Sequence, residues 1–290
     1  SQGRIKVTNV YYAGQLIADQ EAYDATLRGT ADIAIHGAAF TPGRFPTLDL
    51  LGAAPISSNC RYPSAAVTEI WKKFPQYYEK GFEGAKLLGT FTMTPTPPGL
   101  PIATKNKPVR RLEDLKGLKL MGPGRYNMKV LKTFGASMMV VPPFEMYTAL
   151  EKGIIDGVAI DPIFYEIISL KEVIRYQMNI SVIVAPFFIT MNQDRWESLP
   201  NDIQEIFLKT AVDYGKVVDR YVNNRQNAIL KNTVEKHGLK LIDLPESEME
   251  RLRVMEKPLI AKHIAEYEAK NIPAQKIWDA WIEAMGKYSK

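Results

Sequence analysis

The chain has 290 residues, of which 46% are hydrophobic, so it is long enough for two domains with a sizeable core. Its longest apolar runs fall well short of the roughly 20 residues that cross a bilayer, which argues against a membrane-spanning protein. The net charge of +5 comes from 37 basic and 32 acidic residues that are interleaved along the chain. This mixed surface argues against a nucleic-acid-binding protein.

The N-terminal part has the pattern of a crossover unit, in which a helix connects two strands. The segments are a strand at 5–11, a helix at 19–27 that Gly29 ends, and a strand at 31–35. The last strand leads into a loop that begins with His36 and contains Phe40. The single cysteine, Cys60, excludes an internal disulfide. The Pro- and Gly-rich segment 94–101 is predicted to be a connector between two domains.

The segment 105–161 predicts two further crossovers in succession. Apolar strands at 118–121, 138–141 and 154–160 alternate with helices that begin near Arg125 and after Pro142, and Gly135 and Gly153 stand at the helix ends. Two crossovers of about a dozen residues each favour a parallel, doubly wound sheet. Ligands bind beyond the carboxyl ends of the strands in such sheets. The loops 121–126 and 161–166 therefore form the predicted ligand edge.

The C-terminal half is predicted to be mainly helical. A strand-like run at 180–191, broken by Pro186, precedes a helical pattern from 200 to about 236 that Gly238 ends. About 37 helical residues would reach about 55 Å, which means that both domains share this helix, unless it bends or divides at Gly215. The segment 246–288 predicts two or three helices with boundaries at Pro258 and Pro273.

Motifs of enzymes are absent from the sequence. It has no G-x-G-x-x-G after a strand, no P-loop, no G-x-S-x-G and no H-E-x-x-H. Its three histidines, His36, His237 and His263, stand on different predicted elements, so no metal site, cofactor or catalytic triad is expected. An α/β enzyme is therefore disfavoured.

The order of several segments resembles the DctP-type solute-binding proteins of TRAP transporters. The segments are SQGRIKV, YYAGQL, LRGTADIAI, TPGRFPTLDLL, KPVRRLEDLKGLKL, FGAS, VPPFEMYTALEKGIIDG and MNQDRWESLP. The likeness covers nearly the whole chain, although the family's first strand and helix, which precede the segment matching SQGRIKV, have no counterpart in this sequence.

The resemblance implies an α/β fold like that of periplasmic binding proteins, with two domains, mixed and mostly parallel sheets, a hinge and a long domain-spanning helix. We expect domain I to contain residues 1–98 and 185–225 and domain II to contain 99–184 and 226–290, with the helix at about 200–236 shared by both. The family implies a periplasmic, soluble monomer that closes over a small solute and delivers it to a sodium-coupled membrane permease. No export signal begins this sequence. A receptor that presents its ligand to a sensor is the alternative.

Two positions depart from the family pattern. Most members have an arginine after the strand that matches residues 117–120, where it pairs with the ligand carboxylate, and this chain has Met121. Arg125, at the start of the next helix, is the expected substitute unless it is solvated. Asp161 stands where the family often has a neutral hydrogen-bonding residue, which would shift the pocket toward neutral or cationic ligands. That argument fails if Asp161 caps a helix or pairs with Arg125.

Other residues of the predicted ligand site are aromatic or polar. The candidates are Phe40, Tyr126, Phe164, Phe188, Tyr147, Glu145 and His36. Two of the six aromatic residues near the edge, which also include Tyr165 and Phe187, are expected to face the ligand, and the rest are expected to be core. Each of three candidates has a structural alternative. Tyr147 could pack in the core, Glu145 could pair with the helix dipole, and His36 could be a structural histidine with its hydrogen bonds made inside the protein. This lining favours an organic acid with an apolar or aromatic portion, or else a small amine, over a plain dicarboxylate.

Overall fold

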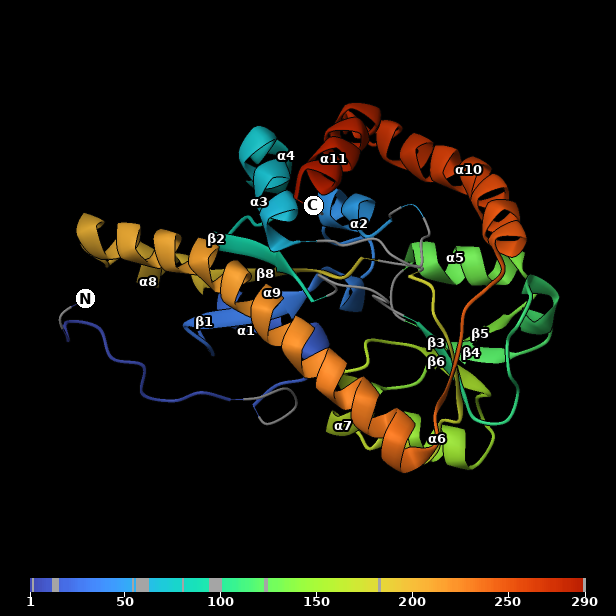
Figure 1. The fold of residues 1–290 in the computed structure, drawn as a ribbon. Coiled ribbons are helices and arrows are strands. Elements are labelled where there is room, and N and C mark those ends of the chain that lie inside the picture. The colour runs from blue at the N-terminus through green and yellow to red at the C-terminus, as the bar shows by residue number, and fades with distance from the viewer. Residues whose placement is uncertain are drawn as a thin grey trace.

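Two β-sheets organise the chain (Figure 1). The computed structural model describes all residues except 2, 12–15, 54, 56–62, 80, 94–100, 123–124, 182–183 and 289–290. The first sheet has the order β1-β8-β2, with β1 at Ile33–Gly37, β8 at Pro186–Asn192 and β2 at Ala85–Thr92. The second has the order β5-β4-β6-β3-β7-β9, with strands at Ser137–Met139, Lys119–Met121, Gly157–Ala159, Ile102–Thr104, Tyr176–Met178 and Lys240–Ile242. The mixed α/β fold is as predicted.

The segment 105–161 folds as the two successive crossovers that the sequence predicted. β4 pairs in parallel with β5 on one side and with β6 on the other. The connections contain α5 at Arg125–Thr133, and η4 and α6 at Pro143–Glu145 and Met146–Glu151. Gly135 and Gly153 adopt left-handed backbone conformations, with φ of +84° and +70°, which explains why the helices end before them. The 3-10 turn η3 at Leu112–Leu115 precedes β4.

The predicted N-terminal crossover is wrong. The helix forms, as η1 at Asp19–Glu21 and α1 at Ala22–Leu27, but residues 5–11 form no strand. Val7 and Val10 are 71% and 67% exposed, because no described strand lies beside this segment to pair with its backbone. β1 pairs instead with β8, and the two strands are antiparallel. An alternating pattern of apolar residues forms a strand only where another part of the chain pairs with it and covers its apolar face.

The first sheet and its neighbours are covered by short helices. These are η2 at Ala38–Phe40, α2 at Pro46–Leu51, α3 at Ser64–Lys73, α4 at Pro75–Glu79 and α8 at Gln193–Glu197, while α7 at Phe164–Ile167 and η5 at Leu170–Glu172 follow β6. Buried side chains form two core clusters, and each contains residues from both sheets. Among the described residues, no helix is both long enough and apolar enough to cross a membrane.

α9, at Asn201–His237, is one continuous helix of 37 residues, as the sequence predicted. It runs past the first sheet and continues to α7 beside the second (Figure 1). Gly215 does not divide it: a Cβ there would lie 3.0 Å from the Cβ of Ser64, so the glycine lets α3 approach closely. Gly89 likewise lets β2 approach α9 closely, since a Cβ there would lie 2.8 Å from the Cβ of Ala211 on α9. α9 therefore packs tightly against the first sheet.

The C-terminal segment forms two helices, α10 at Glu246–Glu268 and α11 at Ala274–Tyr288. Pro273 precedes α11 as predicted, but Pro258 lies inside α10 and is no boundary. Its ring leaves the carbonyl of Val254 without a helical partner, and Val254 is exposed, so water can reach that group. α11 packs against α2 and α3 of the first sheet's layer, although the predicted division places it in domain II. The domain boundaries themselves stay a prediction.

Candidate functional site

Five half-buried apolar side chains that lie at or near strand ends, or on α6, pack against one core cluster. Met93 follows β2, Phe187 stands near the start of β8, Met121 ends β4, Phe164 begins α7 beyond β6, and Tyr147 lies on α6. All five pack against the same core cluster, which contains buried residues of both sheets. We call these five residues the strand-end group. Met121, Tyr147 and Phe164 were predicted for the site, so the structure brings three of the candidates to one cluster.

The predicted residues of the first sheet fall on two faces. Phe188 is 0% exposed and packs in an aromatic core, with ring centroids 4.5 Å from Phe45 and 4.8 Å from Phe82. Its neighbour Phe187 points to the other face, where its ring meets that of Phe40 edge to face at 6.1 Å. Phe40 therefore extends the strand-end group, whereas Phe188 is a core residue.

His36 is buried on the same face as Phe188. It is 2% exposed, its Nε2 lies 3.0 Å from the hydroxyl of Thr41, and its ring centroid lies 5.3 Å from that of Phe188. A histidine with these contacts stabilises the loop after β1. The structure thus matches the structural role that the sequence left open for His36.

Asp161 is held by neutral groups at the end of β6. It is 3% exposed, its Oδ1 accepts a hydrogen bond of 2.8 Å from the backbone N–H of Ile163, and its Oδ2 accepts one from the amide of Gln226 on α9. Burial raises the pKa of Asp161 to about 7, and the two hydrogen bonds oppose the shift. The carboxyl thus stabilises an Asx-type turn in the loop that leads into α7, whose N-cap residue is Ile163.

The remaining candidates lie on or near α5 and α6. Arg125 begins α5 as predicted, but its side chain lies outside the described part of the chain. Tyr126 is 3% exposed, and its hydroxyl donates a hydrogen bond of 2.9 Å to Oε1 of Glu256 on α10. Burial and the adjacent Glu256 raise the pKa of Tyr126 far above its usual value. Glu145 ends η4 and is exposed. The connector 94–100 and Cys60 also lie outside the described residues.

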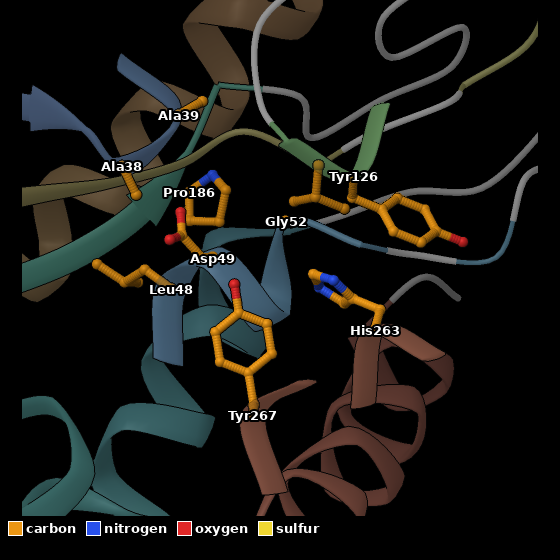
Figure 2. A pocket seen from close by; sticks show the side chains of 10 residues that line it. Ala38, Ala39, Leu48, Asp49, Gly52, Tyr126, Pro186, His263 and Tyr267 are labelled. Atoms are coloured by element: carbon orange, nitrogen blue, oxygen red, sulfur yellow. The ribbon is translucent and has the colours of Figure 1, made fainter. Parts of the chain in front are cut away.

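A small cavity lies where α2, α5 and α10 meet (Figure 2). Tyr126, His263, Tyr267, Asp49 and Pro186 are among the residues that line it. Its volume of about 20 Å³ has room for about one water molecule. In Figure 2, Tyr267 reaches from α10 toward Asp49, and His263 lies between Tyr126 and Gly52. The cavity is too small for an organic ligand, and we treat it as part of the junction between helices.

His263 sits in this junction in its neutral form. It is 2% exposed, and neither ring nitrogen makes a well-formed hydrogen bond, although the carbonyls of Asp49 and Leu50 face it. Burial, helped by the charge of Lys129, lowers the pKa of His263 to about 4, and Glu266 partly opposes this. The imidazole must therefore gain a proton when the chain unfolds at a pH between about 4 and 6.5.

Replacement of His263 with phenylalanine is expected to remove an acid-dependent loss of stability. The pKa of His263 is lower in the folded chain than in the unfolded chain. The contribution of the neutral imidazole to the free energy of unfolding is therefore complete above pH 6.5 and is lost as the pH falls through 4. The wild type should lose about 3 kcal/mol of unfolding free energy relative to the variant over this range, at 1.36 kcal/mol per pKa unit. Urea unfolding from pH 4 to 7 measures this difference. The half-buried His237 at the end of α9, changed to Asn, is the control; equal slopes for both variants would contradict the prediction.

Several residues of the site were missed by the sequence reasoning. Gln226 and Glu256 are each 2% exposed and hold Asp161 and Tyr126 from distant helices. One signal was available for Gln226, because it stands at helical spacing from Val222 and Ile229, which are apolar and buried. A polar residue in an apolar stripe predicts a buried hydrogen bond. Among the described residues, no cluster of three or more His, Cys, Asp or Glu side chains could hold a metal ion.

Residues 1–267 match the DctP family, which is family 7 of the bacterial extracellular solute-binding proteins. The chain belongs to this family. The resemblance drawn from the ordered segments is therefore confirmed, and the family consists of solute-binding proteins of transport, not enzymes.

Relatives and solved structures agree with this assignment. A monocarboxylate 2-oxoacid-binding periplasmic protein of Nostoc is 25% identical over 73% of this chain, and the match covers 58% of the relative. A TRAP solute-binding protein of Rhodoferax ferrireducens, in complex with benzoate, has a TM-score of 0.83 and 21% identity, with 95% of this chain and 85% of that chain covered. A TRAP periplasmic solute-binding protein of Bordetella bronchiseptica, with bound mandelate, has a TM-score of 0.81 and 21% identity, with 94% and 85% covered. These structural matches show the fold.

Proposed function

We propose that this member of the DctP family binds a small organic acid with an apolar or aromatic portion in the periplasm and delivers it to a sodium-coupled TRAP permease. The observation that carries the proposal is the strand-end group, which presents half-buried Met, Phe and Tyr side chains at or near strand ends or on α6. Apolar and aromatic walls with a few polar groups are typical of small-molecule sites. Solved relatives with benzoate and mandelate support an acid of this kind.

Arg125 supplies the cation for the carboxylate in this proposal. It begins α5, a helix of nine residues whose N-terminus favours an anion, four positions after Met121. The thioether of Met121 offers no charge to a carboxylate, so the acid needs a partner nearby. Phe164 and Phe187 would then cover the apolar part of the ligand.

Benzoate and mandelate are expected to raise the melting temperature, because they bind the folded chain. At 100 times Kd the gain is about 2.7 kcal/mol, or roughly 5 °C for a chain of this size. Benzylamine has the same ring with a cation in place of the carboxylate and should cause no shift. Arg125→Ala should weaken benzoate binding by about 10–100-fold, which corresponds to a lost charge-assisted hydrogen bond.

The matched control is Lys132→Ala, which removes an exposed charge from the last turn of the same helix. Isothermal titration of wild type and both variants separates the outcomes. A shift with benzylamine and none with the acids would replace the acid by an amine as the ligand class. Equal benzoate affinity in the Arg125 variant and the wild type would remove Arg125 from the site.

A further inference from the structure

Two polar side chains on the inner face of α9 make hydrogen bonds that connect this one helix to both sheets. Asp219 and Gln226 are seven residues apart, which is nearly two turns and a rise of about 10.5 Å, so both point to the same side. Val218 and Val222 on this face are 7% and 0% exposed. Gln226 is 2% exposed and Asp219 is half-buried, and leucine or valine would fill such positions without the cost of burying polar atoms. Asp219 and Gln226 therefore need an explanation beyond packing.

Asp219 connects α9 to the end of β2 through Ser64. Its Oδ2 accepts a hydrogen bond of 3.0 Å from the backbone N–H of Ser64, and its Oδ1 accepts one of 2.5 Å from the Ser64 hydroxyl. The Ser64 oxygen in turn accepts a bond of 3.1 Å from the backbone N–H of Thr92, the last residue of β2. Met93, of the strand-end group, follows directly. The carboxylate thus fixes one edge of the proposed ligand site.

Gln226 connects the same helix to the end of β6. Its amide donates to Oδ2 of Asp161, which stands two residues after β6 and also holds the backbone of Ile163. Phe164, of the strand-end group, is the next residue after Ile163. Arg225, adjacent on α9, pairs with Glu166 on α7 and adds a second contact to this loop. The amide of Gln226 thus fixes a second edge of the proposed ligand site, at the end of β6.

We propose that Asp219 and Gln226 are positioning residues that together set the distance between the two edges and so select the length of the ligand. The inference rests on the proposed function, because it concerns the same site. A rigid helix keeps its two anchor points at a constant separation, and each anchor reaches its strand end through one or two hydrogen bonds. Loss of either anchor frees one edge, so ligands of different length then bind with more similar affinity.

The test compares three acids of increasing length, benzoate, phenylacetate and 3-phenylpropanoate, by isothermal titration. The wild type is expected to favour one length by tenfold or more over at least one other. Asp219→Ala and Gln226→Met should each reduce this ratio by about tenfold. The double variant should reduce it little further, because both changes loosen the same gap. Asp219→Asn keeps an acceptor for Ser64 and should preserve the ratio.

Controls separate positioning from general damage. Asn227→Ala removes an exposed amide that donates only across one helical turn, to Asn223 at 3.2 Å, and should leave the ratio unchanged. Gln226→Asn keeps an amide but shortens the side chain by one methylene, and it should change the preferred length, which a loss of stability would not do. This variant decides the matter if Gln226→Met does not fold.

The outcomes are distinct. If the wild type binds none of the acids, the proposed function fails and the length selection fails with it. If the wild type binds them without regard to length, or if the anchor variants keep the wild-type ratio, the inference alone is overturned.

Discussion

Replacement of Phe188 with alanine is expected to lower the free energy of unfolding by about 3–5 kcal/mol, the usual cost of removing a large buried aromatic side chain. The ring is 0% exposed and lies 4.5–6.2 Å, centroid to centroid, from those of Phe45, Phe82, His36 and Tyr23. These neighbours come from four separate parts of the first sheet's layer, so we expect much of the cavity left by the ring to remain. Urea unfolding of the variant measures the loss.

Phe187→Ala is the matched control, because the two residues are adjacent on β8 and point to opposite faces. Phe187 is half-buried in the strand-end group, so its loss should cost less stability but weaken benzoate binding by at least tenfold. Phe188→Ala should retain the benzoate affinity of the wild type once it is folded. The reverse result, with Phe188 controlling affinity and Phe187 controlling stability, would contradict the assignment of the two faces.

Asp161→Asn is expected to stabilise the chain above neutral pH. The pKa of Asp161 is about 7 in the folded chain against 3.8 for a free side chain, so the folded state holds a proton that the unfolded state releases. The contribution of protonated Asp161 to the free energy of unfolding is therefore complete below pH 3.8 and is lost as the pH rises through 7. This change corresponds to about 4 kcal/mol, at 1.36 kcal/mol per pKa unit.

Asparagine removes the charge and keeps an acceptor for the N–H of Ile163, while the Gln226 amide can rotate to accept its new donor. The difference in unfolding free energy between Asp161→Asn and wild type should rise by several kcal/mol from pH 4 to pH 8. Glu145→Gln, which changes an exposed carboxyl on η4, should show no such rise. A pH-independent difference for Asp161→Asn would mean that the carboxyl titrates normally. Because His263 responds in the opposite direction over the same range, the wild-type profile alone shows only their sum.

Much of the fold could be predicted because its signals are local. The crossovers of 105–161 and the full extent of α9 depend on apolar spacing, prolines and left-handed glycines within a few residues. The predictions that failed depended on distant partners. Residues 5–11 alternate but have no described neighbouring strand, and Pro258 is tolerated because the carbonyl it frees lies on the exposed side of α10.

The site was predicted less completely than the fold. Met121, Phe164 and Tyr147 pack against one core cluster, and their part in a ligand site stays a prediction. The sequence could not tell Phe187 from Phe188, since a shift of one residue moves a strand side chain to the opposite face. It also could not assign Asp161 or Tyr126, whose partners Gln226 and Glu256 lie 65 and 130 positions away.

The sequence by itself determined the family, the two crossovers of 105–161 and the long helix, because each rests on residue spacing within one segment or on the order of segments. Only the tertiary structure decided which polar candidates, such as Asp161 and Tyr126, already have hydrogen-bond partners within the protein. Burial and hydrogen bonding depend on side chains that are far apart in the sequence and come together only in the folded chain. For the same reason, the connection of both strand ends to Asp219 and Gln226 on one helix emerged only from the folded structure.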